Sequence, residues 1–160
     1  MNTENSPGQI LKNLSIIYSA MFVGILIVVG IASLMVGQSF PELPDNPLLD
    51  LILLYIAIGL GLILIVLAHG VYHSRLKKLP QNSTLLMKMK IYQKAILTRL
   101  ALIGVATLIS SVTFVITKNT NMILLVAITI LFFIMHRPSK FKTAGELRLN
   151  AEETELLSQN

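Results

Sequence analysis

Histidine is the residue type in this chain best suited to bind a metal ion or a haem. His69 and His73 are four residues apart and therefore share one face of a helix, and His136 follows a separate apolar segment. No carboxylate accompanies them, and the chain has no cysteine, which excludes disulfides, thiolate ligands and cysteine nucleophiles. We therefore expect solvated histidines, no cofactor and no catalytic residue, with a metal site or a bis-histidine haem site as the alternative.

Basic residues gather around Arg99 and are candidates for contact with an anion. Lys88, Lys90 and Lys94 precede Arg99, which stands in an otherwise apolar segment. A long arginine side chain in that setting either reaches back to lipid headgroups or makes a functional contact with an anion or a lipid. The lysines would add an attraction for anionic lipid of about 1 kcal/mol per charge.

Acidic and hydroxyl side chains are the residues that could carry ions or line a polar path across a membrane. Coupling to protons or sodium needs an ionisable group inside the membrane, and none of the eight acidic residues lies within an apolar segment; Asp50, at the edge of one, comes closest. One apolar segment does contain hydroxyl residues, namely Thr107, Ser110, Ser111, Thr113 and Thr117. They either line a polar path or bond to carbonyls of the preceding turn of their own helix.

Small residues at helical spacing mark expected contacts between helices, because helices in lipid associate by close packing. The expected contact residues are Ala20, Gly24, Ala57, Gly61, Ala68, Gly104, Thr107 and Ser111. The apolar segment near the C-terminus has only Ala127 of this kind and is otherwise bulky. We expect the first three apolar segments to form the core, and the fourth to pack at its edge or against another subunit.

Composition is typical of a membrane protein. The 160 residues are 54% hydrophobic and only 13% charged, whereas soluble chains average about half apolar and about a quarter charged residues. The net charge of +5 is spread between apolar segments and is not gathered in one basic domain. We therefore expect lipid, and no nucleic acid, as a partner.

Four apolar segments are the predicted spans, at about residues 14–36, 48–71, 95–117 and 122–137. The first is longer than the ~7–15 residues of a signal-peptide core and lacks an A-x-A ending, which favours an uncleaved anchor helix. The last is shorter than the ~20 residues usually needed, so a buried or re-entrant segment is the alternative to a full crossing. The predicted fold class is all-α, a four-helix bundle in the membrane.

The segments outside these spans differ in charge and predict the orientation. An acidic outer loop with three prolines occupies residues 37–47, a basic loop 72–94, and the two tails 1–13 and 138–160. Every Lys and Arg except Lys118 lies in a tail, in the basic loop or at the adjoining end of a span. The positive-inside rule then places both termini and the basic loop in the cytoplasm, which for a bacterial chain means a multi-pass protein of the inner membrane.

Helical spacing continues through the basic loop into the third span. Leu85, Tyr92 and Ile96 fall on one face, and no helix breaker follows them. The pattern predicts a single helix of about 33 residues, about 50 Å long, that extends into the cytoplasm. In the C-terminal tail, Asn150 followed by Glu153 predicts a capping box at the start of a short helix.

Three motifs of the second half carry a likeness to a known family: KIYQKAILTRLAL at residues 90–102, RPSK at 137–140 and ELRLN at 146–150. They resemble a family of small uncharacterised four-helix membrane proteins of Bacteroidota, over about residues 85–153. The resemblance implies the four-span architecture and no assigned activity. Members often carry Glu-Gly midway along the third span, similar to rotary ATPase proteolipid subunits. Ile103 and Gly104 stand there in this chain, which argues against a proton-carrying role.

Three functions follow as expectations. The leading one is a non-enzymatic membrane protein that acts by helix association, as a homo-oligomer or as an accessory subunit of an inner-membrane complex. The alternative is a small oligomeric transporter or channel without an intramembrane carboxylate, whose path uses the hydroxyls of the third span and Arg99. An enzyme would have to use the remaining candidates for chemistry, which are His69, His73, His136 and Arg99.

Overall fold

Helices make up the regular structure of the protein. The computed structural model describes residues 6–37, 47–79 and 83–157, and no strand occurs within these ranges. The three long helices are α1 (Pro7–Gly37), α2 (Pro47–Lys77) and α3 (Leu85–Thr117). Each is long and apolar enough to cross a membrane. The chain is therefore an all-α protein with three long helices that could span a membrane.

The chain after α3 forms shorter helices, α4 (Asn121–Met135), α5 (Lys140–Glu146) and α6 (Ala151–Leu156). α4 has 15 residues and is therefore about 22 Å long, less than the ~30 Å of bilayer hydrocarbon. The axis of α5 is bent by 81° from that of α4. The chain thus turns away after α4 and does not prolong it.

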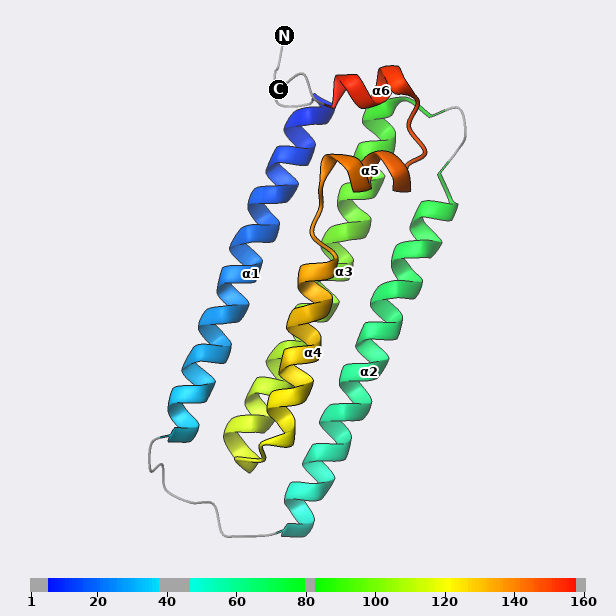
Figure 1. The fold of residues 1–160 in the computed structure, drawn as a ribbon. Helices are drawn as coiled ribbons and strands as arrows, with labels where there is room; N and C mark the ends of the chain where they lie inside the picture. The colour runs from blue at the N-terminus through cyan, green and yellow to red at the C-terminus, as the bar shows by residue number, and fades with distance from the viewer. Residues whose placement is uncertain (1–5, 38–46, 80–82, 158–160) are drawn as a thin grey trace.

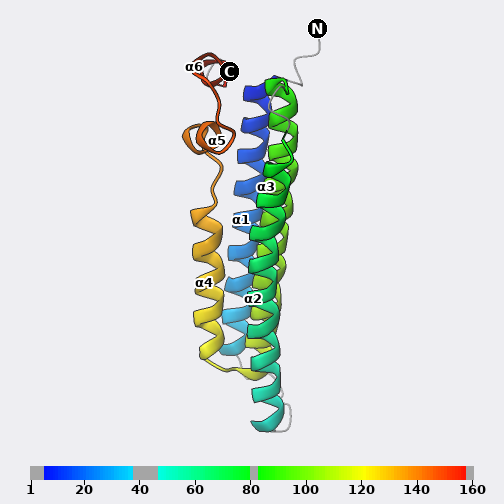
Figure 2. The same ribbon diagram turned by 90° about the vertical axis from the view of Figure 1, so that its right-hand side faces the viewer.

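α3 lies at the centre of the molecule. It packs against α1, α2 and α4, and Figures 1 and 2 show α4 on one face of a layer made by the three long helices. The start of α1, the end of α2 and the start of α3 lie at one end of the molecule, together with α5 and α6 (Figure 1). We call this the basic end, because Lys12 is near the start of α1, Arg75 near the end of α2, Lys88 near the start of α3 and Arg148 just after α5, whereas Lys118 follows the other end of α3.

Local sequence explains where the long helices begin and end. Pro7 and Pro47 are the first residues of α1 and α2. The first N–H groups of a helix have no acceptor within the helix, so the N–H that proline lacks costs no hydrogen bond there, and the fixed φ of proline suits a helix. α3 ends where Lys118 adopts a left-handed conformation, with φ of 49°, and donates its backbone N–H to the carbonyl of Phe114.

Two local predictions are confirmed. α3 has the predicted 33 residues, because nothing in the sequence interrupts its helical spacing. Asn150 and Glu153 form the predicted capping box at the start of α6. α1 and α2 extend beyond the predicted spans, since a helix can continue past the edge of the hydrocarbon. The predicted outer loop lies almost wholly outside the described residues.

Two groups of buried side chains hold the helices together. Toward the basic end, Leu14 of α1, Tyr92 of α3 and Phe133 of α4 have no exposed surface. Toward the opposite end, Ala57 of α2 packs in a group with Phe114 of α3. Such close packing, and not exclusion of water, is what holds helices together in lipid.

Candidate functional site around Arg99

Arg99 is a charged residue enclosed by the protein. It is only 7% exposed, and its guanidinium carbon lies 4.3 Å from the centroid of the Tyr72 ring. No carboxylate among the described residues forms an ion pair with it. An aromatic face thus stands where a carboxylate partner is usual. Whether Arg99 also reaches lipid headgroups, or contacts an anion or a lipid, stays a prediction.

Two tyrosines converge on one carboxylate beside Arg99. The hydroxyl of Tyr72 donates to Oε2 of Glu146 at 2.5 Å, and the hydroxyl of Tyr92 donates to the same oxygen at 2.9 Å. Oγ1 of Thr143 donates to the Tyr92 hydroxyl at 3.2 Å. Hydrogen bonds to an ionised acceptor are the stronger kind. They join α2, α3 and α5 at the basic end.

The bend between α4 and α5 brings Glu146 to this position. α5 is capped at its start by Ser139, whose hydroxyl accepts the backbone N–H of Lys142 at 3.3 Å, and it ends at Glu146. The chain therefore returns the carboxylate to α2 and α3. Tyr72 then stands between two opposite charges, its ring against Arg99 and its hydroxyl against Glu146.

A cavity of about 390 Å³ lies beside Arg99, between α2, α3 and α4; we call it the Arg99 cavity. Its lining residues are Ile65, Val66, Ala68, His69, Gly70, Arg99, Ile103, Phe132 and His136. Apart from Arg99 and the two histidines the lining is apolar. The volume is within the ~300–1,000 Å³ typical of small-molecule sites.

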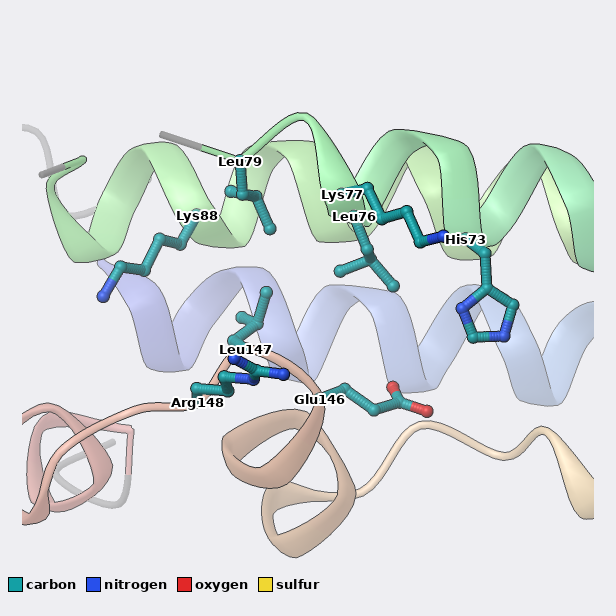
Figure 3. Close-up of a pocket in the computed structure, with 8 residues that line it drawn as sticks. All are labelled: His73, Leu76, Lys77, Leu79, Lys88, Glu146, Leu147 and Arg148. Carbon is teal, nitrogen blue, oxygen red and sulfur yellow. The ribbon is translucent and has the colours of Figure 1, made fainter. Parts of the chain in front are cut away.

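A second hollow, of about 580 Å³, opens nearer the basic end. It is lined by His73, Leu76, Lys77, Leu79, Lys88, Glu146, Leu147 and Arg148 (Figure 3). Figure 3 shows residues of α2 on one side and the end of α5 on the other, with Glu146 extending toward His73. Glu146 therefore lines the second hollow and also accepts the hydrogen bonds from Tyr72 and Tyr92.

The three candidate histidines are divided between the two hollows. His69 and His136 line the Arg99 cavity, and His73 lines the second hollow. The rings of His69 and His73 meet edge to face with centroids 4.4 Å apart, while Nδ1 of His136 donates to the carbonyl of Phe132 at 2.6 Å. Within the described ranges, no group of three or more His, Asp or Glu side chains is placed to hold a metal ion.

The three lysines predicted to contact anionic lipid have different surroundings. Lys88 forms an ion pair with Oε1 of Glu153 at 2.7 Å and so joins α3 to α6. This hydrogen bond from Lys88 holds the pKa of Glu153 below its ordinary value. Lys90 and Lys94 are exposed. Contact with lipid stays a prediction for these lysines, and Lys88 would have to leave Glu153 to make it.

Some of the small residues predicted to mark helix contacts are buried between helices of this chain, and others are exposed. Those buried inside the chain are Ala57, Gly61, Ala68, Thr107 and Ser111. A Cβ at Gly104 would lie 3.9 Å from Cδ1 of Ile25, so α1 and α3 are close there. Ala20 and Gly24, by contrast, are exposed, and a Cβ at Gly24 would meet nothing within 4 Å.

Hydroxyl groups of α3 bond to their own helix. Thr107, Ser110 and Ser111 donate to the carbonyls four residues earlier at 3.0, 2.8 and 2.8 Å, and Thr117 does the same at 2.9 Å. Intrahelical bonding is confirmed for these four of the five predicted hydroxyls.

The residue pattern did not reveal Tyr72 and Glu146 as neighbours of Arg99. Tyr72 falls at the start of the predicted basic loop and Glu146 in the predicted C-terminal tail. A tyrosine inside an otherwise apolar helix was the available signal, because its buried hydroxyl needs a partner. The partner itself depends on the bend after α4, which spacing does not predict.

Fold and site together define an all-α chain with membrane-type helices and an enclosed arginine beside an apolar cavity. Comparisons with protein-family models, with curated proteins and with solved structures find no match to this chain. The resemblance of its second half to a Bacteroidota family stays a prediction.

Proposed function

We propose that this chain is a four-helix bundle in a bacterial inner membrane, crossing it four times with both termini in the cytoplasm. The lengths of α1, α2 and α3 support three crossings. The apolar helix α4, followed by His136 and Arg137, supports the fourth, because a bilayer can thin around a short span whose ends carry polar side chains. The gathering of Lys and Arg at the basic end, against Lys118 at the other, supports the orientation.

We infer that the protein acts without catalysing a reaction, by helix association, as a homo-oligomer or as an accessory subunit of a larger inner-membrane complex. One observation carries this proposal: among the predicted contact residues, Ala20 and Gly24 of α1 are exposed, whereas those of α2 and α3 pack within the chain. The α1 outer face consists of Ile17, Ala20, Gly24, Ile27 and Ile31, all exposed and on one side of the helix. Small residues on such a face let another helix backbone approach closely.

The hydrogen bonds of the polar residues also favour association over transport. The hydroxyls of α3 are bonded to their own helix, and Glu146 is held by two tyrosines. A path along α3 would have to break these bonds. The α1 outer face needs no such rearrangement before it contacts a partner.

The test is a bulky substitution on the α1 outer face, Gly24→Leu. The protein is purified from native membranes in a mild detergent, and its mass and co-purifying proteins are measured by light scattering and mass spectrometry. We expect the natural sequence to give a defined oligomer or a stoichiometric partner, and Gly24→Leu to lose it, because the added side chain separates the backbones.

Gly30→Leu is the matched control. Gly30 is also in α1, and a Cβ there likewise meets nothing within 4 Å, but it lies about 120° around the helix from Gly24. The control should associate like the natural sequence. A monodisperse monomer without a partner, or a Gly24→Leu protein that associates normally, would refute the proposal.

A further inference from the structure

The guanidinium of Arg99 reaches the Arg99 cavity with unused donors. No hydrogen bond joins it to any residue in the described part of the chain, although every fully buried side-chain nitrogen or oxygen there has a partner. Its N–H groups are therefore not fully buried, and the space beside them is the cavity that Arg99 lines. A guanidinium has five N–H donors in a planar fork that matches a carboxylate or a phosphate.

Away from Arg99, most side chains that line the cavity are apolar. Ile65, Ile103 and Phe132 line it on three different helices, α2, α3 and α4. Val66 also lines it and is 69% exposed, so the cavity is not sealed from the surroundings of the bundle. Where α2 and α4 lie in a bilayer, those surroundings are acyl chains.

Two histidines add polar groups near the arginine. Nδ1 of His136 donates to the carbonyl of Phe132, so the neutral ring offers Nε2 as an acceptor, which could bind only an O–H of a ligand, such as that of a monoprotonated phosphate. His69 lines the same cavity. An anion beside Arg99 would meet a permanent positive charge, and its apolar part would meet isoleucine and phenylalanine.

We propose that the Arg99 cavity binds a single-chain anionic amphiphile, with its carboxylate or phosphate on Arg99 and its chain along Ile103 and Phe132. The anion would supply the charged partner that the protein itself does not give Arg99, which matters because an unpaired charge away from water is unfavourable. The volume of about 390 Å³ is at the small end of ligand sites and favours one acyl chain over two. This proposal does not depend on helix association.

The test uses the full chain in nanodiscs of zwitterionic lipid, with bound ligand counted by native mass spectrometry. The probes are dodecanoate and dodecyl phosphate, which distinguish a carboxylate from a phosphate source. Methyl dodecanoate tests the need for charge, and acetate and inorganic phosphate test the need for a chain. We expect one dodecanoate or one dodecyl phosphate per chain to bind saturably, and the other three probes to bind at least about tenfold more weakly, about 1.4 kcal/mol.

Two substitutions test the place of binding. Arg99→Gln should weaken binding about tenfold or more, because it removes the charge. Gly70→Phe should also block binding by filling the cavity, since Gly70 lines it and a Cβ there meets nothing within 4 Å. Gly59→Phe is the matched control, because Gly59 is on the same helix with the same free space but outside the cavity lining; it should bind normally.

Gly70→Phe also keeps the proposal testable if Arg99→Gln does not fold. Saturable binding that Gly70→Phe abolishes and Gly59→Phe leaves unchanged supports the cavity. The proposal is overturned if methyl dodecanoate binds as well as dodecanoate, if neither anionic amphiphile saturates at one per chain, or if Gly70→Phe binds like the natural sequence.

Discussion

Arg99 keeps a positive charge inside an apolar part of the molecule, and its neighbours explain how. The ring of Tyr72 offers its negative face at 4.3 Å, a contact that contributes about 2 kcal/mol when desolvated. The hydroxyl of the same ring binds Glu146, which adds a negative charge nearby without direct pairing. The arginine is thus stabilised while its donors stay available to the cavity.

Tyr92 joins Glu146 to Thr143 in this arrangement. Its hydroxyl donates to Glu146 and accepts from Thr143, and the side chain has no exposed surface. Tyr92→Phe removes both hydrogen bonds and leaves the buried Thr143 hydroxyl without its acceptor. We expect the free energy of unfolding to fall by about 2 kcal/mol, as for other bonds to charged groups, measured by titration with SDS in mixed micelles.

Tyr55→Phe provides the control for that measurement. Tyr55 is 68% exposed, so removing its hydroxyl should change the free energy of unfolding by less than about 0.5 kcal/mol. Equal effects of the two substitutions would show that the Glu146 network does not hold α5 in place.

At the scale of the elements, α4 is the helix whose attachment needs explanation, because it is short and lies on one face of the three long helices (Figure 2). An aromatic cluster holds it to α1. The ring of Phe133 stacks on Tyr18 and Phe22 with centroids 5.2 and 5.9 Å away, and the Tyr18 hydroxyl donates to the Phe133 carbonyl at 3.1 Å. Phe133 therefore anchors the end of α4 nearest Arg99.

Phe133→Ala should loosen this attachment. The side chain is fully buried, so its removal leaves a cavity and is expected to lower the free energy of unfolding by about 3 kcal/mol. The hydrogen bond from Tyr18 goes to backbone and should survive. Hydrogen exchange of α4, measured together with unfolding, would show the loss locally.

Phe141→Ala is the matched control, since Phe141 lies in α5 and is 93% exposed. It should leave both unfolding and exchange close to those of the natural sequence. If the two alanine variants unfold alike, the aromatic cluster is not what holds α4.

At the scale of the whole molecule, the number of crossings depends on α4. The basic end gathers α5, α6 and the ends of the long helices (Figure 1). If α4 crosses the membrane, the loop before it and the helix after it lie on opposite sides. If α4 is re-entrant, they lie on the same side.

Single cysteines decide between these arrangements, because the natural chain has no cysteine to react in the background. Thr120, Lys90 and Lys140 are exposed and are each replaced by Cys. An impermeant maleimide applied to spheroplasts should label Thr120→Cys at once, and should label Lys90→Cys and Lys140→Cys only after the membrane is opened. Immediate labelling of Lys140→Cys would rule out a fourth crossing.

The sequence by itself determined the features that depend on local spacing and composition. Long apolar runs predict the membrane-type helices, because backbone groups in lipid must bond within their own helix. Uninterrupted spacing from Leu85 to Thr117 predicts the length of α3, and Asn150 with Glu153 predicts the cap of α6. Each is a property of neighbours along the chain.

Only the tertiary structure decided what surrounds Arg99 and which small residues remain exposed. Tyr72 and Glu146 are 74 residues apart, and they meet because the chain bends by 81° after α4. Ala57 and Gly24 look alike in the sequence, but one is buried and the other exposed. Spacing shows which residues share a face of a helix, whereas packing with distant segments decides what that face contacts.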